Sequence, residues 1–131
     1  MKTARKKVLV ADCDEEVLIA LERMLEDAGF DTTTVWTGRD VLRLLQRQSF
    51  DLILVGECLP DTECKEILQA LRQTGAPTPC IVLQPRTAAM PAWDAFRHLG
   101  ACEMLCKREF PQVVRVVTRW LGVTEVAARA A

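Results

Sequence analysis

The stretch Asp51-Leu-Ile-Leu-Val-Gly-Glu-Cys-Leu-Pro60 decides the fold that we predict for this chain. Its apolar run, Leu52 to Val55, is bounded by a charged residue and a glycine, which is typical of a strand buried on both faces. In doubly wound α/β sheets, the loops that follow such strands hold the functional residues. Gly56 stands first after this strand, and it has no side chain. The position at which such a fold usually carries a functional side chain therefore has none in this sequence.

Strand and helix patterns alternate on both sides of this central strand. Apolar runs predict five strands, at residues 6–11, 31–36, 52–55, 80–83 and 103–106. Apolar residues at helical spacing predict five helices, which begin after Asp14 and at Gly38 and cover about residues 63–74, 89–99 and 110–121. The alternation predicts a parallel sheet with helices on both faces. Right-handed crossovers favour a single flavodoxin-like (βα)5 domain with strand order 2-1-3-4-5.

Individual segments allow more detailed structural predictions. The strand at 31–36 is rich in threonine and more polar than the others, so we expect it at an edge of the sheet. Asp14 is expected to cap the first helix, because Glu15 and Glu16 occupy its first turn. The last helix carries an apolar stripe that we expect to be buried, made of Phe110, Val113, Val114, Val117 and Trp120.

Length and charge limit the classes of protein to which the chain can belong. Its 131 residues suit one domain, at 1–122, followed by an Ala-rich extension or linker at 123–131. Lys and Arg number 17 against 18 Asp and Glu, and this balance argues against nucleic acid and anionic membranes as partners. No apolar run approaches the roughly 18 residues that span a bilayer, and no secretory signal opens the chain. We therefore expect a cytoplasmic protein.

The six cysteines are best interpreted as reduced thiols of a cytosolic protein, because they are scattered through strands and helices. They are Cys13, Cys58, Cys64, Cys80, Cys102 and Cys106. No Cys-x-x-Cys pair is present, and the single His98 completes no zinc-binding set. Cys13 and Cys58 lie on loops predicted to be adjacent, so a redox or soft-metal sensor remains an alternative to simple buried packing.

The loops after strands one, three, four and five are expected to converge at one crevice. They hold Asp12-Cys13-Asp14, Gly56-Glu57-Cys58, Gln84 and Lys107. Together with their flanking motifs, these positions resemble the receiver domain of bacterial two-component response regulators. The resemblance runs from about Lys6 to Leu121. It rests on Val-Leu-Val-Ala-Asp after the first strand, Asp-Leu-Ile-Leu-Val-x-x-x-Leu-Pro through the third, Pro79-Cys-Ile-Val-Leu, Gly100-Ala101 and Lys107.

The resemblance implies a mechanism for the family. A carboxylate at the end of the third strand attacks a phosphoryl group donated by a histidine kinase and forms an acyl phosphate. Acidic residues after the first strand help to hold Mg²⁺, which offsets the charge on the phosphoryl oxygens. A Thr or Ser after the fourth strand and a Lys after the fifth contact the phosphoryl group. Their movement remodels the surface formed by the fourth helix, fifth strand and fifth helix.

Residue by residue, this chain departs from the family pattern. Counting back from Pro60, the phosphoacceptor position is Gly56, which cannot act as a nucleophile. Cys13 stands where a second acidic residue is expected, and Gln84 stands at the hydroxyl position. The aromatic position is Met104, and Arg108 replaces the usual proline. Asp12 and Lys107 remain, with Asp14 as a nearby acid, so we expect no cofactor and weak or absent Mg²⁺ binding.

Several residues near the crevice allow two interpretations. Glu57 is either a built-in mimic of phosphate or a solvated loop charge, which strand alternation favours. Asp61 is either a substitute phosphate acceptor or part of a turn before the third helix. Asp12 and Asp14 either bind a cation weakly or are relics, with Asp14 as the helix cap. Lys107 either pairs with Asp12 or contacts an anionic ligand.

The leading hypothesis is a degenerate, receiver-like signalling module that is not an enzyme and acts by phosphorylation-independent protein contact. Its expected partner is a histidine kinase, an output domain or a second copy of the chain. The expected interaction face carries Trp93, Met104, Arg108 and Trp120, where the two tryptophans either pack inward or mark the interface. The alternatives are a receiver phosphorylated on Asp12, Asp14 or Asp61, and a sensor based on Cys13 and Cys58.

Overall fold

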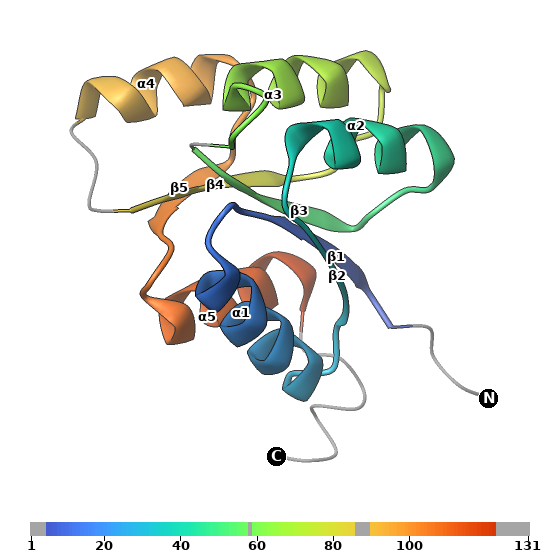
Figure 1. Ribbon diagram of the computed structural model, residues 1–131, viewed down its shortest axis with the longest axis vertical. Helices are drawn as coiled ribbons and strands as arrows, with labels where there is room; N and C mark the ends of the chain where they lie inside the picture. Colours follow the sequence, from blue (N-terminus) through green and yellow to red (C-terminus); the bar gives the residue numbers. More distant parts are fainter. Residues whose placement is uncertain (1–4, 58, 86–89, 123–131) are drawn as a thin grey trace.

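Five parallel strands form one sheet in the order β2-β1-β3-β4-β5 in a computed structural model that describes residues 5–57, 59–85 and 90–122 (Figure 1). The strands are β1 (Lys7–Ala11), β2 (Asp31–Val35), β3 (Leu52–Gly56), β4 (Cys80–Gln84) and β5 (Glu103–Cys106). The helices are α1 (Glu15–Asp27), α2 (Gly38–Arg47), α3 (Cys64–Gln73), α4 (Met90–His98) and α5 (Phe110–Leu121). The predicted flavodoxin-like topology is confirmed.

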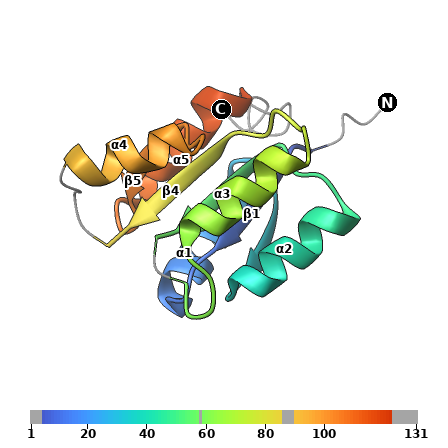
Figure 2. The same ribbon diagram turned by 90° about the horizontal axis from the view of Figure 1, so that it is seen from above.

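The helices cover the sheet in two layers. Helices α1 and α5 lie on one face, and α2, α3 and α4 lie side by side on the other (Figures 1 and 2). Alternate residues of β1 supply the two cores, because successive side chains of a strand point to opposite faces. Val8 and Val10 belong to the cluster with α1 and α5, whereas Leu9 and Ala11 belong to the cluster with α2 and α3.

The central strand is buried on both faces, as its sequence predicts. Every residue of β3 and of its neighbour β4 is buried. Both strands run one residue further than predicted, so that Gly56 and Gln84 are their last residues and pair within the sheet. The polar strand β2 is at one edge, as predicted, and its residues are partly or fully exposed.

Local signals place the first helices. Asp14 caps α1, since its side chain accepts a hydrogen bond of 3.0 Å from the Glu16 backbone N–H. Gly29 follows α1 with a φ of 95°, a left-handed conformation that a glycine adopts without steric cost. Thr37 caps α2 by accepting from the Asp40 backbone N–H at 3.1 Å. Asp14 and Thr37 thus start α1 and α2 at the carboxyl edge of the sheet, whereas Gly29 follows α1 at the amino edge, just before β2.

The prediction for α5 is wrong at its last turn. Trp120 is 44% exposed instead of buried, whereas Val116, which the predicted stripe omitted, is buried with Val113 and Val117. The reason lies in the sheet: Trp120 stands beside Glu103, at the start of the edge strand β5, where no further strand covers it. Its indole N–H donates to the Glu103 carboxylate.

No helix within the described ranges is both long enough and apolar enough to cross a membrane. The predicted extension at 123–131 lies outside the described residues.

Candidate functional site

The carboxylate of Asp12 fills the space beside Gly56 at the carboxyl edge of the sheet. Asp12 directly follows β1 and is only 2% exposed. A Cβ atom built on Gly56 would lie 2.6 Å from Asp12 Oδ2 and 3.3 Å from the carbonyl oxygen of Ala11. The first of these distances is too short for a real non-bonded contact, so any side chain at position 56 requires Asp12 to move. The position that looked empty in the sequence is therefore occupied by a neighbouring carboxylate.

Two groups of the same protein already satisfy this carboxylate. Lys107 Nζ donates to Asp12 Oδ1 at 3.0 Å, and the Asp14 backbone N–H donates to the same oxygen at 2.9 Å. The Lys107 side chain is 13% exposed, so the ion pair is largely shielded from water. The Lys107 backbone N–H donates to the Gln84 carbonyl at 2.8 Å and thereby aligns the β5–α5 loop with the end of β4. The pairing of Lys107 with Asp12, one of the two interpretations of that lysine, is present.

A second set of ion pairs, more exposed than the first, lies at the start of α1. Arg108 donates to Asp14 Oδ2, and its other guanidinium nitrogen lies 3.5 Å from Glu16 Oε2. The predicted interaction face included Arg108, but its side chain turns toward the start of α1. Lys107 and Arg108 thus join the β5–α5 loop to the β1–α1 loop through successive residues.

The remaining predicted pocket residues are spread around this centre. Cys13 is exposed, so the expectation that it packs in the interior is wrong; its side chain points out of a turn between the end of β1 and α1. Gln84 is 6% exposed at the end of β4. Glu57 is partly buried, and its backbone N–H donates to the Leu83 carbonyl at 2.7 Å. Cys58, the partner proposed for Cys13, lies outside the described residues.

Asp61 has a structural role that its sequence position does not reveal. Its two carboxylate oxygens accept from the backbone N–H groups of Gly38 at 2.8 Å and Arg39 at 3.1 Å, at the start of α2. These hydrogen bonds, first the one from Gly38, lower the pKa of the Asp61 carboxyl below its ordinary value. Asp61 and Gly38 are 23 residues apart, so no local motif announces the contact. Asp61 is exposed, but its oxygens are already engaged.

The donor set does not fit Mg²⁺. This ion requires oxygen ligands in a near-octahedral shell, but Asp12 is held by Lys107 and Asp14 is held by Arg108. Gly56 supplies no oxygen from a side chain, and Cys13 presents a thiol. Within the described ranges, no group of three or more His, Cys, Asp or Glu side chains is arranged to hold a metal ion.

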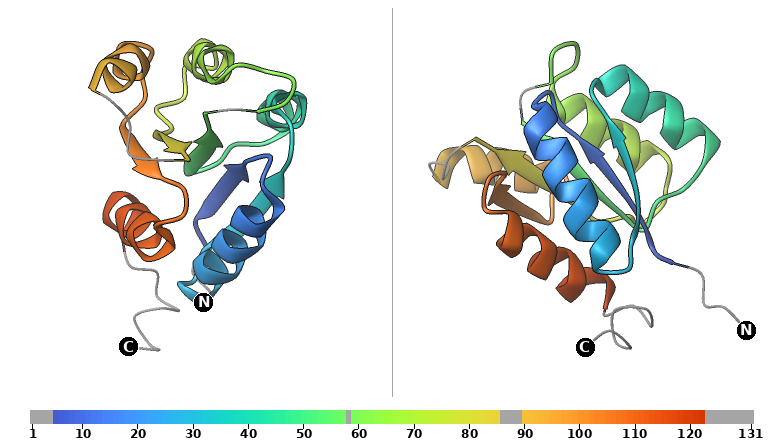
Figure 3. Two further views of the ribbon diagram at one scale, coloured as in Figure 1. Left: turned by 60° about the vertical axis from the view of Figure 1, so that its left-hand side comes forward. Right: turned by 60° about the horizontal axis from the view of Figure 1, so that its bottom comes forward.

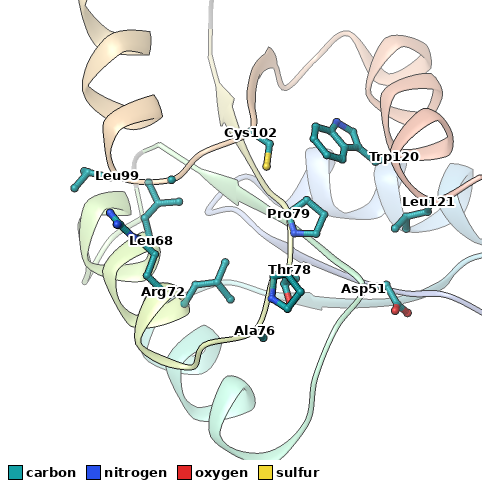
Figure 4. Close-up of a pocket in the computed structure, with 13 residues that line it drawn as sticks. Asp51, Leu68, Arg72, Ala76, Thr78, Pro79, Leu99, Cys102, Trp120 and Leu121 are labelled. Carbon is teal, nitrogen blue, oxygen red and sulfur yellow. The ribbon is translucent and has the colours of Figure 1, made fainter.

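A separate hollow of about 460 Å³ lies at the opposite, amino edge of the sheet (Figure 4). Its walls are mostly apolar, with Arg72 and Asp51 among the polar residues that line it. Trp120 and Leu121, at the end of α5, form part of its wall. Among the other predicted interface residues, Trp93 and Met104 are partly buried against the core layer of α2, α3 and α4. Among the side chains that the structure describes in α4, β5 and α5, the exposed large apolar one is Trp120.

The topology and the comparison with known families define the class to which the protein belongs. The chain is a member of the response regulator receiver domain family, whose sequence profile matches residues 8–118. It is therefore a receiver domain of two-component signalling. Nearly all residues of the strands and helices fall within this match.

Curated relatives include two transcriptional regulators. The Bacillus subtilis alkaline phosphatase synthesis transcriptional regulatory protein PhoP is 31% identical over 126 residues, which cover 94% of this chain and 51% of the relative. The Escherichia coli transcriptional regulatory protein CpxR is 33% identical over 117 residues, which cover 86% of this chain and 49% of the relative. The chain thus spans about half the length of the curated relatives it matches.

Solved structures show the same fold. The chemotaxis response regulator CheY4 of Vibrio cholerae has a TM-score of 0.82 at 25% identity, with 89% of this chain and 99% of that chain covered. The receiver domain of the Pseudomonas aeruginosa sensor histidine kinase PA1611, which contains a coordinated magnesium ion, has a TM-score of 0.79 at 24% identity. That alignment covers 91% of this chain and 99% of the other.

Proposed function

We propose that this receiver domain signals through protein contact and does not accept a phosphoryl group. The observation that carries the proposal is the filled pocket: the Asp12 carboxylate occupies the space beside Gly56 and is paired with Lys107. Acyl phosphate formation needs a carboxylate that can reach the donor. Gly56 has none, and its neighbour Asp12 is buried and bonded to a cation.

The geometry argues against the three substitute acceptors as well. Asp12 is 2% exposed, and phosphorylation would remove the charge of the carboxylate that Lys107 now binds. Asp14 caps α1 and is bound by Arg108. Asp61 holds the N-terminus of α2 with both carboxylate oxygens. Each candidate therefore has a structural bond that phosphorylation would break.

The partner that we propose is a histidine kinase, an output domain or a second copy of this chain, bound to the α4–β5–α5 face. The exposed Trp120 and the adjoining hollow support this choice, because large aromatic side chains at a concave surface are typical of interface centres. Trp93 and Met104 lie on the same side, whereas Arg108 contributes to the face only if it leaves Asp14. This function requires no catalysis, so the module is not an enzyme.

Incubation with a small acyl phosphate donor and Mg²⁺, followed by intact-mass measurement, tests the proposal. We expect no gain of a phosphoryl group by the native chain. A stable gain that peptide mapping assigns to Asp12, Asp14 or Asp61 would overturn it. A double variant, Cys13→Asp with Gly56→Asp, provides the matched comparison: it restores two carboxylates, and we expect it to recover measurable Mg²⁺ affinity.

A further inference from the structure

Two large, exposed apolar side chains line one small hollow between α1 and β2, at the edge of the sheet opposite β5. Ile19 of α1 is 60% exposed and Trp36, directly after β2, is 49% exposed. Both line a hollow of about 100 Å³. Its lining residues come from α1 and from β2 with the residue after it, and these two elements run beside each other (Figure 3). The hollow is completed by Glu15, Leu18, Glu22 and Thr34, and we call these six residues the Ile19–Trp36 surface. Leu18 is 4% exposed and forms its apolar floor.

The rim of this surface is acidic and uncompensated. Glu22 accepts a long hydrogen bond of 3.5 Å from the Thr34 hydroxyl, and no cation among the described residues forms an ion pair with Glu15 or Glu22. The contrast with Asp12 and Asp14, which each have a basic partner, is clear. An apolar centre with a rim of one charge is complementary to an apolar group flanked by opposite charges.

We infer that the Ile19–Trp36 surface binds a protein segment that presents one apolar side chain between Lys or Arg residues. The apolar side chain enters the hollow between Ile19 and Trp36, and the flanking cations pair with Glu15 and Glu22. Burial of the two exposed side chains supplies most of the affinity, since interface energy is concentrated in a few apolar and aromatic anchors. The charges set orientation, association rate and salt dependence.

Other occupants fit this surface less well. If a second copy docked through the same surface across a two-fold axis, Glu15 and Glu22 of one copy would face the same acidic residues of the other. The two copies would therefore repel each other. A drug-sized molecule needs a pocket of about 300–1,000 Å³, whereas this hollow has space for one side chain. Nucleic acid is disfavoured because its phosphates would meet the acidic rim.

This inference goes beyond the proposed function and does not depend on it. The Ile19–Trp36 surface adjoins β2, at the opposite edge of the sheet from β5. A chain that accepted phosphate would still have the surface, and a chain that did not bind a basic segment would still have a filled pocket. The two proposals therefore fail independently.

The test uses the full chain and a short labelled peptide that alternates Lys with Leu, with binding followed by fluorescence polarisation. We expect Ile19→Ala and Trp36→Ala each to weaken binding about tenfold, the effect of losing one buried apolar contact. A matched control, Asp27→Asn, removes an exposed α1 charge that does not line the hollow and should bind like the native chain.

The charge of the rim is tested separately. Glu15→Gln with Glu22→Gln should weaken binding several-fold at low salt and flatten its salt dependence. A peptide with Glu in place of Lys should not bind the native chain. Equal losses from Asp27→Asn and Ile19→Ala, or unchanged binding in both hollow variants, would overturn the inference. Concentration-dependent dimerisation that Ile19→Ala abolishes would do the same, because it would make a second copy the occupant.

Discussion

The pocket at the carboxyl edge and the Ile19–Trp36 surface differ in whether their acidic side chains have basic partners. In the pocket, Asp12 is buried against Gly56 and paired with Lys107, and Asp14 is paired with Arg108. On the surface, Glu15 and Glu22 have no basic partner within the described ranges, and apolar groups are exposed between them. Internal pairing removes the capacity to bind an external ion, whereas unpaired charge beside exposed apolar area retains it. Under the two proposals above, binding takes place at surfaces other than the carboxyl-edge pocket.

The largest effect is expected from removing the cation of the pocket. Lys107→Met leaves the Asp12 carboxylate buried without its partner, and breaking a buried pair in this way costs about 3–5 kcal/mol. Chemical denaturation should show this loss as a lower midpoint with an unchanged slope. Asp12→Asn with Lys107→Met should recover part of the stability, because it removes the unpaired charge. A loss below about 1 kcal/mol, the value typical of an exposed pair, would contradict the description of a closed pocket.

A side chain at position 56 should displace the Asp12 carboxylate and lower the stability of the fold. Gly56→Ala places a Cβ where Asp12 Oδ2 now lies, and this crowding should destabilise the fold by about 1–3 kcal/mol. Gly56→Asp adds repulsion between carboxylates, so it should be less stable than Gly56→Ala at neutral pH. Added Mg²⁺ should reduce the difference in stability between Gly56→Asp and Gly56→Ala only when Cys13→Asp is also present. Equal stabilities of the two variants without metal would show that the carboxylates do not interact.

A smaller loss of stability is expected from substitution of Asp61, whose carboxylate accepts hydrogen bonds from the backbone at the start of α2. Because hydrogen bonds hold its folded-state pKa below the unfolded value of 3.8, its stabilising contribution is present above that value and is lost as the pH falls through the lower, folded-state pKa. Asp61→Asn should therefore lower the melting temperature at pH 7 and make little difference at strongly acidic pH. A difference that stayed constant down to pH 2 would contradict this assignment. Thr37→Ala, which removes the N-cap hydrogen bond of α2, should show no such pH dependence.

The smallest effect is expected at the exposed rim of the pocket. The Arg108 side chain is 52% exposed, so Arg108→Ala should cost only about 0.2–1 kcal/mol, and less at high salt. Hydrogen exchange of the β5–α5 loop should nonetheless speed up, because one of its two links to the β1–α1 loop is lost. Arg115→Ala, on the exposed face of α5, is a matched control and should leave that loop unchanged.

Much of the fold was predictable because its signals are local. The apolar run at 52–55, the threonine-rich strand at 31–36 and the cap at Asp14 each depend on neighbours in the chain, and each prediction is confirmed. Trp120 was predicted wrongly because helical periodicity does not show where the sheet ends. At the candidate site, the sequence shows that position 56 has no side chain and that position 13 has a thiol.

The contacts that close the pocket were beyond the reach of sequence patterns. Asp12 and Lys107 are 95 residues apart, and Asp61 and Gly38 are 23 apart, so only the folded chain brings them together. The same holds for Ile19 and Trp36, which the sequence places on the first helix and at the end of the predicted strand 31–36 without showing that neither is covered.

By itself, the sequence determined the class of fold, the order of its elements and the absence of a side chain at the end of the middle strand. Those properties follow from local backbone preference and from the period of apolar residues. Tertiary structure alone decided that Asp12 enters the vacant space, that Lys107 neutralises it, and that charge and apolar area remain unpaired beside β2. These outcomes depend on distances between residues far apart in the chain, which are set only when the sheet is assembled.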